Sequence, residues 1–494
     1  MKKNKIVWIL VLGLLALASV AVGICVDTGL ARSEEALLKA EEESVRTFKD
    51  WTEEEVFHNV PAFSMGKGRI GEVTDDGEGI FTITVDGNTL EEYRQYIELL
   101  LANGYTKYAD NGVNGINEEV YHTTMTKDNQ VLQVSYMSRV KKSYVTVAED
   151  MPLSEHLLYQ DTYVANQIDG AKTTLYMMEL YGNGNSFVIQ LKNGHFILND
   201  GGTSNDALYL MDFLESLVPE GEKPIIEAWF ISHSHTDHSG VLAKIGEQPQ
   251  LAQRFYVEGV YYTKPSLKII EEASSYTVTE IRAQETGCRF LKNVKGETPD
   301  IYRMQTGQKY YFNDVVVDIL LTTDMVPSEN FTLQGNINET STCMIYNIEN
   351  QKFLLSGDSD FGANRTVERF YSPEYLDVDI MGVFHHGANV HTEFIECYKA
   401  ETLLYPYVGA RGIRYLDEYE VNEELQAAAV EYYHYGNGTK MLTFPYKIGT
   451  TKSLPMLDWK YHEDLSDRTG VNYKLSDNAI LYNPDGSVKN PEDK

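Results

Sequence analysis

The sequence predicts an α/β protein in which strands and helices form a layered sandwich, preceded by a small α+β domain and an N-terminal transmembrane helix. Three observations predict this organisation. An apolar run stands near the N-terminus, a strand–helix–meander pattern follows it, and short strands then alternate with helices over most of the chain. With 494 residues, 43% of them hydrophobic, the chain is long enough for two or three domains.

The N-terminal segment, residues 1–32, predicts a membrane helix that acts as a signal anchor. Lysines among the first five residues precede an uncharged apolar run from Ile6 to Val26. At about 1.5 Å per helical residue the run reaches about 31 Å, enough to cross a bilayer. The lysines favour a cytoplasmic N-terminus, which places the rest of the chain outside the cell. A cleaved signal peptide ending near Gly29–Ala31 is the alternative, and the protein is exported in either case.

A small α+β domain is expected over residues 52–155, after an acidic, helix-prone stalk at residues 33–51. The stretch "GIFTITVDG" alternates as a strand does, and "NTLEEYRQYIELLLANGY" has helical apolar spacing. The stretches "EEVYHTTMT", "QVLQVSYMS" and "SYVTVAE" predict an antiparallel meander. His58 and His122 have no neighbours at ligand spacing, so we expect both on the surface.

Residues 160–460 show strands and helices in alternation, which predicts the layered domain. Three strands at "TLYMMEL", "SFVIQL" and "HFILNDGG" precede the helix "DALYLMDFLESLVP" and the apolar strand "PIIEAWFIS". There follow a strand at "RFYVEGVYYT", a helix at "PSLKIIEEASSYTVTEIRAQE", strands around "YYFNDVVVDILLT", "TCMIYNI" and "KFLLSGD", a helix near Asn364–Phe370 and the strand "VDIMGVF". Residues 461–494 form a polar tail.

Composition excludes some classes of site and partner. The formal net charge is −31 at pH 7, and a strongly negative surface repels polyanions, which argues against broad nucleic-acid binding. The cysteines are far apart and form no CxxC pair, so neither a disulfide framework nor a cysteine-based zinc site is expected. We expect Cys288, Cys343 and Cys397 to be small buried hydrophobic residues.

Four of the predicted strands end in residues of the types that bind metal ions. One of them runs into "ISHSHTDHSGVL", which places three histidines and an aspartate within six positions. Catalytic groups collect at strand ends because the strand fixes the backbone while the loop exposes the side chains. In chain order these residues are Asp200, His233, His235, Asp237, His238, Asp358, His385 and His386.

The spacing within the HxHxDH loop indicates how it would bind metal. In an extended segment His233 and His235 point the same way and can share one ion, whereas Asp237 and His238 lie on the following turn and can hold a second. A carboxylate from another strand, such as Asp358, can bridge the two ions. Imidazole and carboxylate suit Zn²⁺, and Mn²⁺ and iron accept the same ligands. We therefore predict one or two Zn²⁺ ions.

The run "NDGG … SHSHTDHSGVL … NETSTCMIY … LLSGDSD … VFHHGANVHTEF" resembles the metallo-β-lactamase superfamily. It is most similar to the branch that contains the hydrolase domain of the competence protein ComEC and phosphorylcholine esterase. The resemblance covers roughly residues 165 to 450 and implies an αββα metallo-β-lactamase sandwich with one or two metal ions at the sheet edges. The metal ligands that it implies are His233, His235, Asp237, His238, Asp358 and His386.

The resemblance also implies roles for residues beside the ions. Asp200 would orient the histidine-rich loop, Asp237 would take part in catalysis as well as binding metal, and His385 would face the substrate. Contacts to water or substrate could come from Asn338, Ser341 or Asp324.

One departure from the superfamily pattern concerns the first metal. Many members have a further metal-binding histidine between the HxHxDH loop and the GD motif, but this chain has no histidine from Ser239 to Phe384. The first site is therefore short of one protein ligand, and occupancy by a single metal is the alternative to two ions.

These features predict an exported, membrane-anchored, metal-dependent hydrolase. Metal ions lower the pKa of bound water to about 7 and so supply hydroxide at neutral pH. Phosphodiesters suit the site better than lactams, because His385 can neutralise a phosphoryl oxygen as charge builds. The expected substrate is a small-molecule or cell-envelope phosphoester, and the sequence indicates no oligomeric state.

Three alternatives stay open. The chain could be a non-catalytic surface protein that keeps the fold for binding, against which the intact ligand set argues. A metal-dependent oxidoreductase or thioester hydrolase could use the same scaffold, although the HHG motif favours hydrolysis. A ComEC-like nuclease would need a Lys/Arg groove. The only obvious basic group, which we interpret as solvated surface, is Arg365, Arg369, Arg411 and Arg414.

Overall fold

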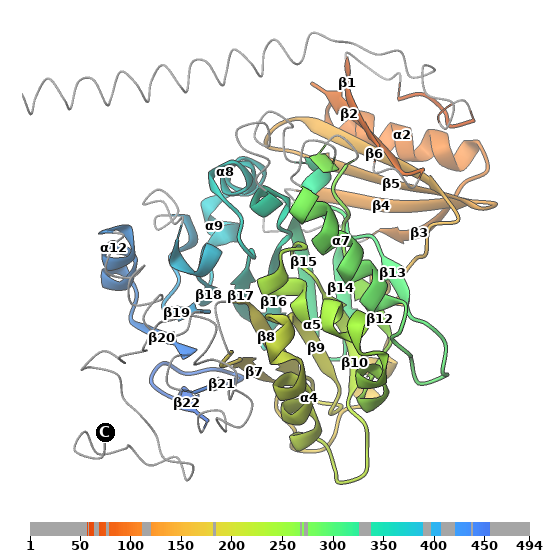
Figure 1. The fold of residues 1–494 in the computed structure, drawn as a ribbon. Coiled ribbons are helices and arrows are strands. Elements are labelled where there is room, and N and C mark those ends of the chain that lie inside the picture. The colour runs from red at the N-terminus through yellow and green to blue at the C-terminus, as the bar shows by residue number, and fades with distance from the viewer. Residues whose placement is uncertain are drawn as a thin grey trace, which may run out of the picture.

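The computed structural model describes most of the chain from residue 57 to residue 454 (Figure 1). The described residues are 57, 59–63, 69–75, 79–110, 120–180, 184–266, 269–270, 275–325, 337–388, 397–406, 420–435 and 438–454. The predicted membrane helix, stalk and polar tail lie outside these ranges, as do His58 and Cys25. Within the ranges, no helix combines the length and apolar character needed to span a membrane.

The first part of the fold is a six-stranded antiparallel sheet with one helix packed on it. Helix α2 (Leu90–Ala102) begins at a capping box formed by Thr89 and Glu92. Its buried residues pack on alternate residues of the sheet, such as Ile83 and Val145. The predicted strand, helix and meander are therefore present, and β1 and β3 extend the sheet beyond the prediction. In sheet order the strands are β1 (Arg69–Asp75), β2 (Phe81–Asp86), β6 (Lys142–Glu149), β5 (Gln130–Met137), β4 (Val120–Lys127) and β3 (Thr106–Asp110).

Two larger sheets form the centre of the remaining fold. In the first, β9, β10, β12 and β13 run parallel and the other main strands antiparallel, with β11 (Tyr256–Val257) paired to β10. In sheet order its strands are β13 (Asp300–Tyr302), β12 (Gly259–Tyr261), β10 (Ile225–Phe230), β9 (Phe196–Asp200), β8 (Ser186–Gln190), β7 (Thr174–Met177), β21 (Lys440–Thr443) and β22 (Lys452–Ser453).

The second large sheet is antiparallel from β14 to β17 and parallel from β17 to β20. Parallel strands β17 and β18, like β9 and β10 of the first sheet, are followed by the residues with metal-ligand chemistry. In sheet order the strands are β14 (Lys309–Phe312), β15 (Val315–Leu321), β16 (Cys343–Ile348), β17 (Gln351–Leu355), β18 (Ile380–Gly382), β19 (Thr402–Tyr405) and β20 (Glu431–His434).

The two large sheets pack face to face, with helices on their outer sides (Figure 1). Aromatic side chains fill the space between the sheets: the ring centroids of Phe187 and Phe353 are 5.4 Å apart. Helices α4 (Ala207–Ser216) and α5 (Thr236–Glu247) share the core of the first sheet, and α8 (Phe361–Phe370) shares that of the second. The mixed α/β layered fold predicted from the sequence is confirmed.

The remaining helices are short apart from α7 (Ser275–Cys288), which packs against α5. They include α3 (Thr162–Ala165), α9 (Pro373–Leu376) and α12 (Glu420–Ala428). The 3₁₀ turns are η2 (Glu155–Leu157), η3 (Ser204–Asp206), η4 (Pro249–Arg254), η5 (Thr323–Met325), η7 (Ile337–Thr340) and η8 (Phe384–Gly387). The cysteines Cys288, Cys343 and Cys397 are buried and free, as expected.

His122 corrects one expectation, because the prediction of a surface histidine there is wrong. The residue is completely buried in β4, opposite Ser135 of β5. Its face of the small sheet packs against the main domain, where a side chain on Gly307 would collide with Val120. Burial lowers the pKa of His122 to about 3, so the ring is neutral.

The contact between α5 and α7 allows no side chain at Gly287. A Cβ atom on Gly287 would lie 1.9 Å from the carbonyl oxygen of Leu242 in α5. We expect Gly287→Ala to lower the free energy of unfolding by about 1–3 kcal/mol, because the helices must separate. Thermal or denaturant unfolding measures the change. Arg282→Ala, on the exposed side of α7, is the control; an equal effect of both substitutions would contradict the close packing.

Candidate metal centre

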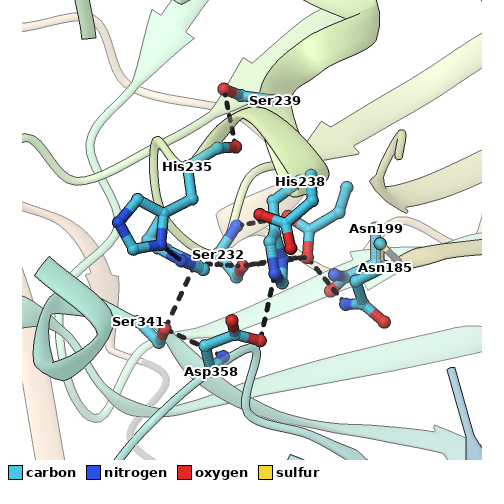
Figure 2. Close-up of polar contacts among 12 residues, drawn as sticks. Asn185, Asn199, Ser232, His235, His238, Ser239, Ser341 and Asp358 are labelled. Carbon is cyan, nitrogen blue, oxygen red and sulfur yellow. Dashed lines mark hydrogen bonds and ion pairs between the residues drawn. The ribbon is translucent and has the colours of Figure 1, made fainter. Parts of the chain in front are cut away.

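The candidate site lies where the two large sheets meet at one edge. Asp200 is the last residue of β9, and the HxHxDH loop connects β10 to α5. Asp358 follows β17 in the second sheet, and His385 and His386 lie in η8, which follows β18. Figure 2 shows His235 and His238 of the first sheet's loop facing Asp358 from the second. The eight residues singled out in the sequence are brought to this one edge.

Four of these residues form one group of potential ligands. One ligand atom from each of Asp237, His238, Asp358 and His386 lies within 4.8 Å of the others. The His386 Nε2 atom is 3.5 Å from Asp237 Oδ2 and 3.4 Å from Asp358 Oδ1. The His238 Nε2 atom is 3.0 Å from the same Asp358 oxygen. Two imidazoles and two carboxylates thus converge, a ligand set that suits Zn²⁺.

A second group has three members: His233, His235 and Asp358. The His233 Nε2 and His235 Nδ1 atoms are 3.0 Å apart. Asp358 belongs to both groups, so its carboxylate lies between two potential ion positions. The predicted pairing of His233 with His235, and of Asp237 with His238, agrees with this division.

The buried atoms at the centre fit a cation. His238 Nε2 and Asp358 Oδ1 are both buried and form an ion pair at 3.0 Å, but neither atom makes a hydrogen bond. Without a proton or a metal ion between them, leaving two such buried polar atoms unsatisfied costs roughly 1–3 kcal/mol each. A divalent ion would satisfy both atoms together, which makes the arrangement suited to metal binding.

Hydrogen bonds on the outer side of the histidines aim their Nε2 atoms inward. The Nδ1 atom of His238 is 2.9 Å from the Asp200 carboxylate, and that of His386 is 2.8 Å from the Pro406 carbonyl oxygen. Because the Pro406 oxygen can only accept, Nδ1 of His386 carries the proton. A neutral His386 ring therefore presents a lone pair at Nε2 to Asp237 and Asp358.

The Asp200 carboxylate contacts both ends of the histidine-rich loop, at Ser232 and at His238. This buried carboxylate accepts hydrogen bonds from the Ser232 amide (2.7 Å), the Ser232 hydroxyl (2.8 Å) and the Asn185 amide group (2.7 Å), besides the contact with His238. These bonds keep Asp200 in the left-handed region, with φ 58°. Figure 2 shows Ser232 and Asn185 on either side of His238.

Charges within the cluster shift its pKa values. Burial disfavours the charged ring, but Asp358 and Asp200 outweigh it and raise the pKa of His238 well above its ordinary value. In the same way Asp358 and Asp237 raise the pKa of His386 to about 10. The pKa of Asp358 is held well below its usual range by His238, His386 and His385, despite burial. Without metal, protons on His238 and His386 therefore balance the carboxylates.

Asn338, Ser341 and His385 lie beside the ligands, as expected. The Ser341 hydroxyl accepts from the Asp358 amide (3.1 Å) and is 3.3 Å from His233 Nδ1. The His385 Nε2 atom is 3.4 Å from the Asn338 amide nitrogen and 3.6 Å from Asp358 Oδ2. The His385 side chain is 22% exposed, whereas that of His386 is 6% exposed, so His385 is the more accessible of the two.

Asp324, another residue expected near the ions, belongs to neither ligand group. Its carboxylate accepts from the Thr322 hydroxyl (2.6 Å) and pairs with Arg303 at 3.3 Å, so it has a structural partner of its own. Of the four arginines interpreted as surface, Arg369 is exposed, whereas Arg365 is half-buried over the ring of Phe361. The other two lie outside the described residues.

Several residues with a clear place in the site are not identified from the sequence. Ser232 stands directly before the HxHxDH loop, and Glu339 lies inside the "NETS" stretch. Both could therefore have been found from their position next to recognised motifs. Asn185 and Glu280 offer no such indication. Glu280, in α7, accepts a hydrogen bond of 3.0 Å from the Thr236 amide at the start of α5.

The part of the chain that carries the site matches a known protein family. Residues 181–405 match the model of the metallo-beta-lactamase superfamily. No curated protein matches the chain. Among solved structures, the metallo-beta-lactamase fold protein YhfI from Bacillus subtilis matches with 13% identity and a TM-score of 0.34, over 53% of this chain and 96% of its own. Zn²⁺-bound PqqB from Methylobacterium extorquens matches with 11% identity and a TM-score of 0.28, over 47% and 71%. Residues 181–405 thus form a domain of the metallo-beta-lactamase superfamily, whose members are generally metal-dependent hydrolases.

Proposed function

We propose that this domain hydrolyses phosphodiester bonds with two divalent metal ions, on a small-molecule or cell-envelope substrate. The observation that carries the proposal is the place of Asp358 in both ligand groups. A carboxylate shared by two ions is suited to a two-metal site, which stabilises both the attacking and the leaving oxygen of an in-line displacement at phosphorus.

In this proposal the two groups hold one ion each. His233, His235 and Asp358 would hold the first, and Asp237, His238, Asp358 and His386 the second. Bound Zn²⁺ would supply Lewis acidity and lower the pKa of a water molecule. The first group has three protein ligands and so leaves a coordination position open, which is what a catalytic zinc requires. Because the second group has four protein ligands and the first has three, the first ion would be bound more weakly.

His385 supports a phosphoester as the substrate. Its ring is the more accessible of the two adjacent histidines, and its Nε2 atom lies beside Asn338 and Asp358. From there it can donate a hydrogen bond to a phosphoryl oxygen as negative charge builds. The similarity of the motifs to the branch with ComEC and phosphorylcholine esterase supports the same class. The net charge of −31 favours a small phosphodiester over long DNA.

Metal content and hydrolysis test this function together. We expect the full chain to carry near-stoichiometric zinc or manganese and to hydrolyse bis-p-nitrophenyl phosphate. Asp358→Ala removes a ligand from both groups, so bound metal and rate should both fall, the rate by about 100-fold or more. Elemental analysis and the release of p-nitrophenolate measure the two quantities.

His195→Ala is the matched control for this experiment. His195 pairs with Glu227 at 2.9 Å and belongs to neither ligand group, so its removal should change neither metal content nor rate. Metal-free protein from a metal-supplemented culture would contradict the metal centre. Bound metal without phosphodiester hydrolysis would reject the substrate class alone.

Metal binding should release protons. The raised pKa of His386, about 10, means that the metal-free ring is protonated at pH 7, and the metal must displace that proton. Affinity should therefore rise as the pH rises toward 10 and fall at lower pH. Calorimetric titration with zinc at pH 7, in two buffers of different ionisation enthalpy, should show about one proton or more released per chain. A heat independent of the buffer would contradict the protonated state.

We further propose that the chain is exported and held in the membrane by its N-terminal helix, because lysines precede the apolar run. Protease added to intact cells should then digest everything beyond the stalk while a cytoplasmic marker stays intact. Protection of residues 160–460 would reject this orientation.

A further inference from the structure

We propose that Glu339 is a positioning residue of the metal centre, which fixes η7 beside Asp358 and His233 by capping α8 from outside that helix. This inference rests on the proposed function, since it concerns how the first ion is held. Glu339 is 6% exposed and belongs to neither ligand group.

The carboxylate of Glu339 bonds to the start of α8 with both oxygens. Oε1 accepts from the Gly362 amide at 3.0 Å, and Oε2 accepts from the Ala363 amide at 2.7 Å. These amides belong to the first turn of α8, where backbone N–H groups have no partner within the helix. A carboxylate there is also favoured by the helix dipole. The two bonds therefore account for the burial of a charged side chain.

Capping alone does not explain this arrangement, because α8 has its own N-cap. Asp360 is its N-cap residue, and the Asp360 carboxylate accepts from the Phe361 amide at 2.8 Å. Glu339 comes from a separate segment, so its bonds join η7 to α8. Asp358 lies two residues before the N-cap of this helix, Asn338 precedes Glu339 in η7, and Ser341 directly follows η7. The joined segments therefore both border the ligand cluster.

Hydrogen bonds connect η7 to His233 and Asp358 of the first group of ligands. The Ser341 amide donates to the Asn338 carbonyl at 2.9 Å, which ties Ser341 to η7. The Ser341 hydroxyl is 3.1 Å from the Asp358 amide and 3.3 Å from His233 Nδ1. A shift of η7 would therefore change the orientation of His233 and of Asp358.

The second group is held by different contacts. The outer nitrogen of His238 is fixed by Asp200, and that of His386 by the Pro406 carbonyl, and both anchors lie outside η7. Loss of the Glu339 bonds should therefore weaken the first ion more than the second. Asp358 is shared, so a small effect on the second ion is expected as well.

Variants of Glu339 and Asp360 separate positioning from helix stability. Glu339→Ala removes both bonds to α8, whereas Glu339→Gln keeps one acceptor and loses the charge. Asp360→Ala removes the bond to the Phe361 amide and leaves the two Glu339 bonds in place, and is the matched control. Each full-length variant is freed of metal and titrated with zinc by calorimetry, and its thermal unfolding midpoint is measured. His235→Ala removes a ligand of the first group only, so the binding event that it weakens is that of the first ion.

We expect Glu339→Ala to weaken the first ion about tenfold and the second by less than about threefold, with Glu339→Gln in between. Asp360→Ala should lower the unfolding midpoint but leave both affinities unchanged. Equal effects of the two alanine variants, or an unchanged first ion in Glu339→Gln, would overturn the positioning role. If the unaltered chain binds no zinc, the proposed function itself fails. This result differs from both outcomes that would overturn the positioning role of Glu339. Should Glu339→Ala not fold, Glu339→Gln decides by itself.

Discussion

His238 lies between two buried carboxylates, and this interaction joins the two sheets of the sandwich. Its Nδ1 atom is 2.9 Å from Asp200, which ends β9, and its Nε2 atom is 3.0 Å from Asp358, which follows β17. Removing such charges from water costs several kcal/mol each unless they are paired. The sheet edges must therefore stay at this spacing with positive charge between the carboxylates, supplied by a proton or by a metal ion.

The backbone strain near the cluster follows from that requirement. Asp200, His385 and His386 have φ values of 58°, 45° and 56°, in a region that costs non-glycine residues about 1–3 kcal/mol each. The left-handed turn brings His386 back toward Asp358 and leaves His385 more exposed. Hydrogen bonds to Asp200, and the bond from His386 to Pro406, hold these conformations. Near the cluster, positive φ therefore occurs at residues whose side chains contact it.

The candidate ligand residues could be predicted because each segment that carries them follows a strand of strong apolar character. Strand ends fix the backbone, and His and Asp in close spacing restrict the chemistry. Residues whose role depends on a partner far away in the sequence could not be found in this way. Asp324 stands after a strand as the candidate ligands do, yet its carboxylate pairs with Arg303. The bonds from Glu339 to the start of α8 join residues far apart in the sequence, so they form only in the folded chain.

The sequence also does not show that the small domain packs against the main domain. Alternate polar residues in its strands, such as Gln133 and Thr146, are typical of a face exposed to water. The structure buries this face: Thr82 and Thr146 share a hydrogen bond of 2.8 Å, and Gln305 of the main domain donates to Thr146. A sequence pattern cannot distinguish a polar interface from a polar surface.

This interface links the small domain to the metal centre through a single helix. Val120, Met137 and Tyr144 of the small sheet share a hydrophobic core with α8, where the ring centroids of Tyr144 and Phe370 are 6.4 Å apart. Hydrogen bonds depend on position more strictly than apolar contacts do, so the polar contacts fix where the domain sits and the apolar ones hold it there. Since α8 ends at Phe370 and begins at the Glu339 bonds, the small domain packs on one end of the helix whose other end borders Asp358. The small sheet is therefore part of the support for the candidate metal centre.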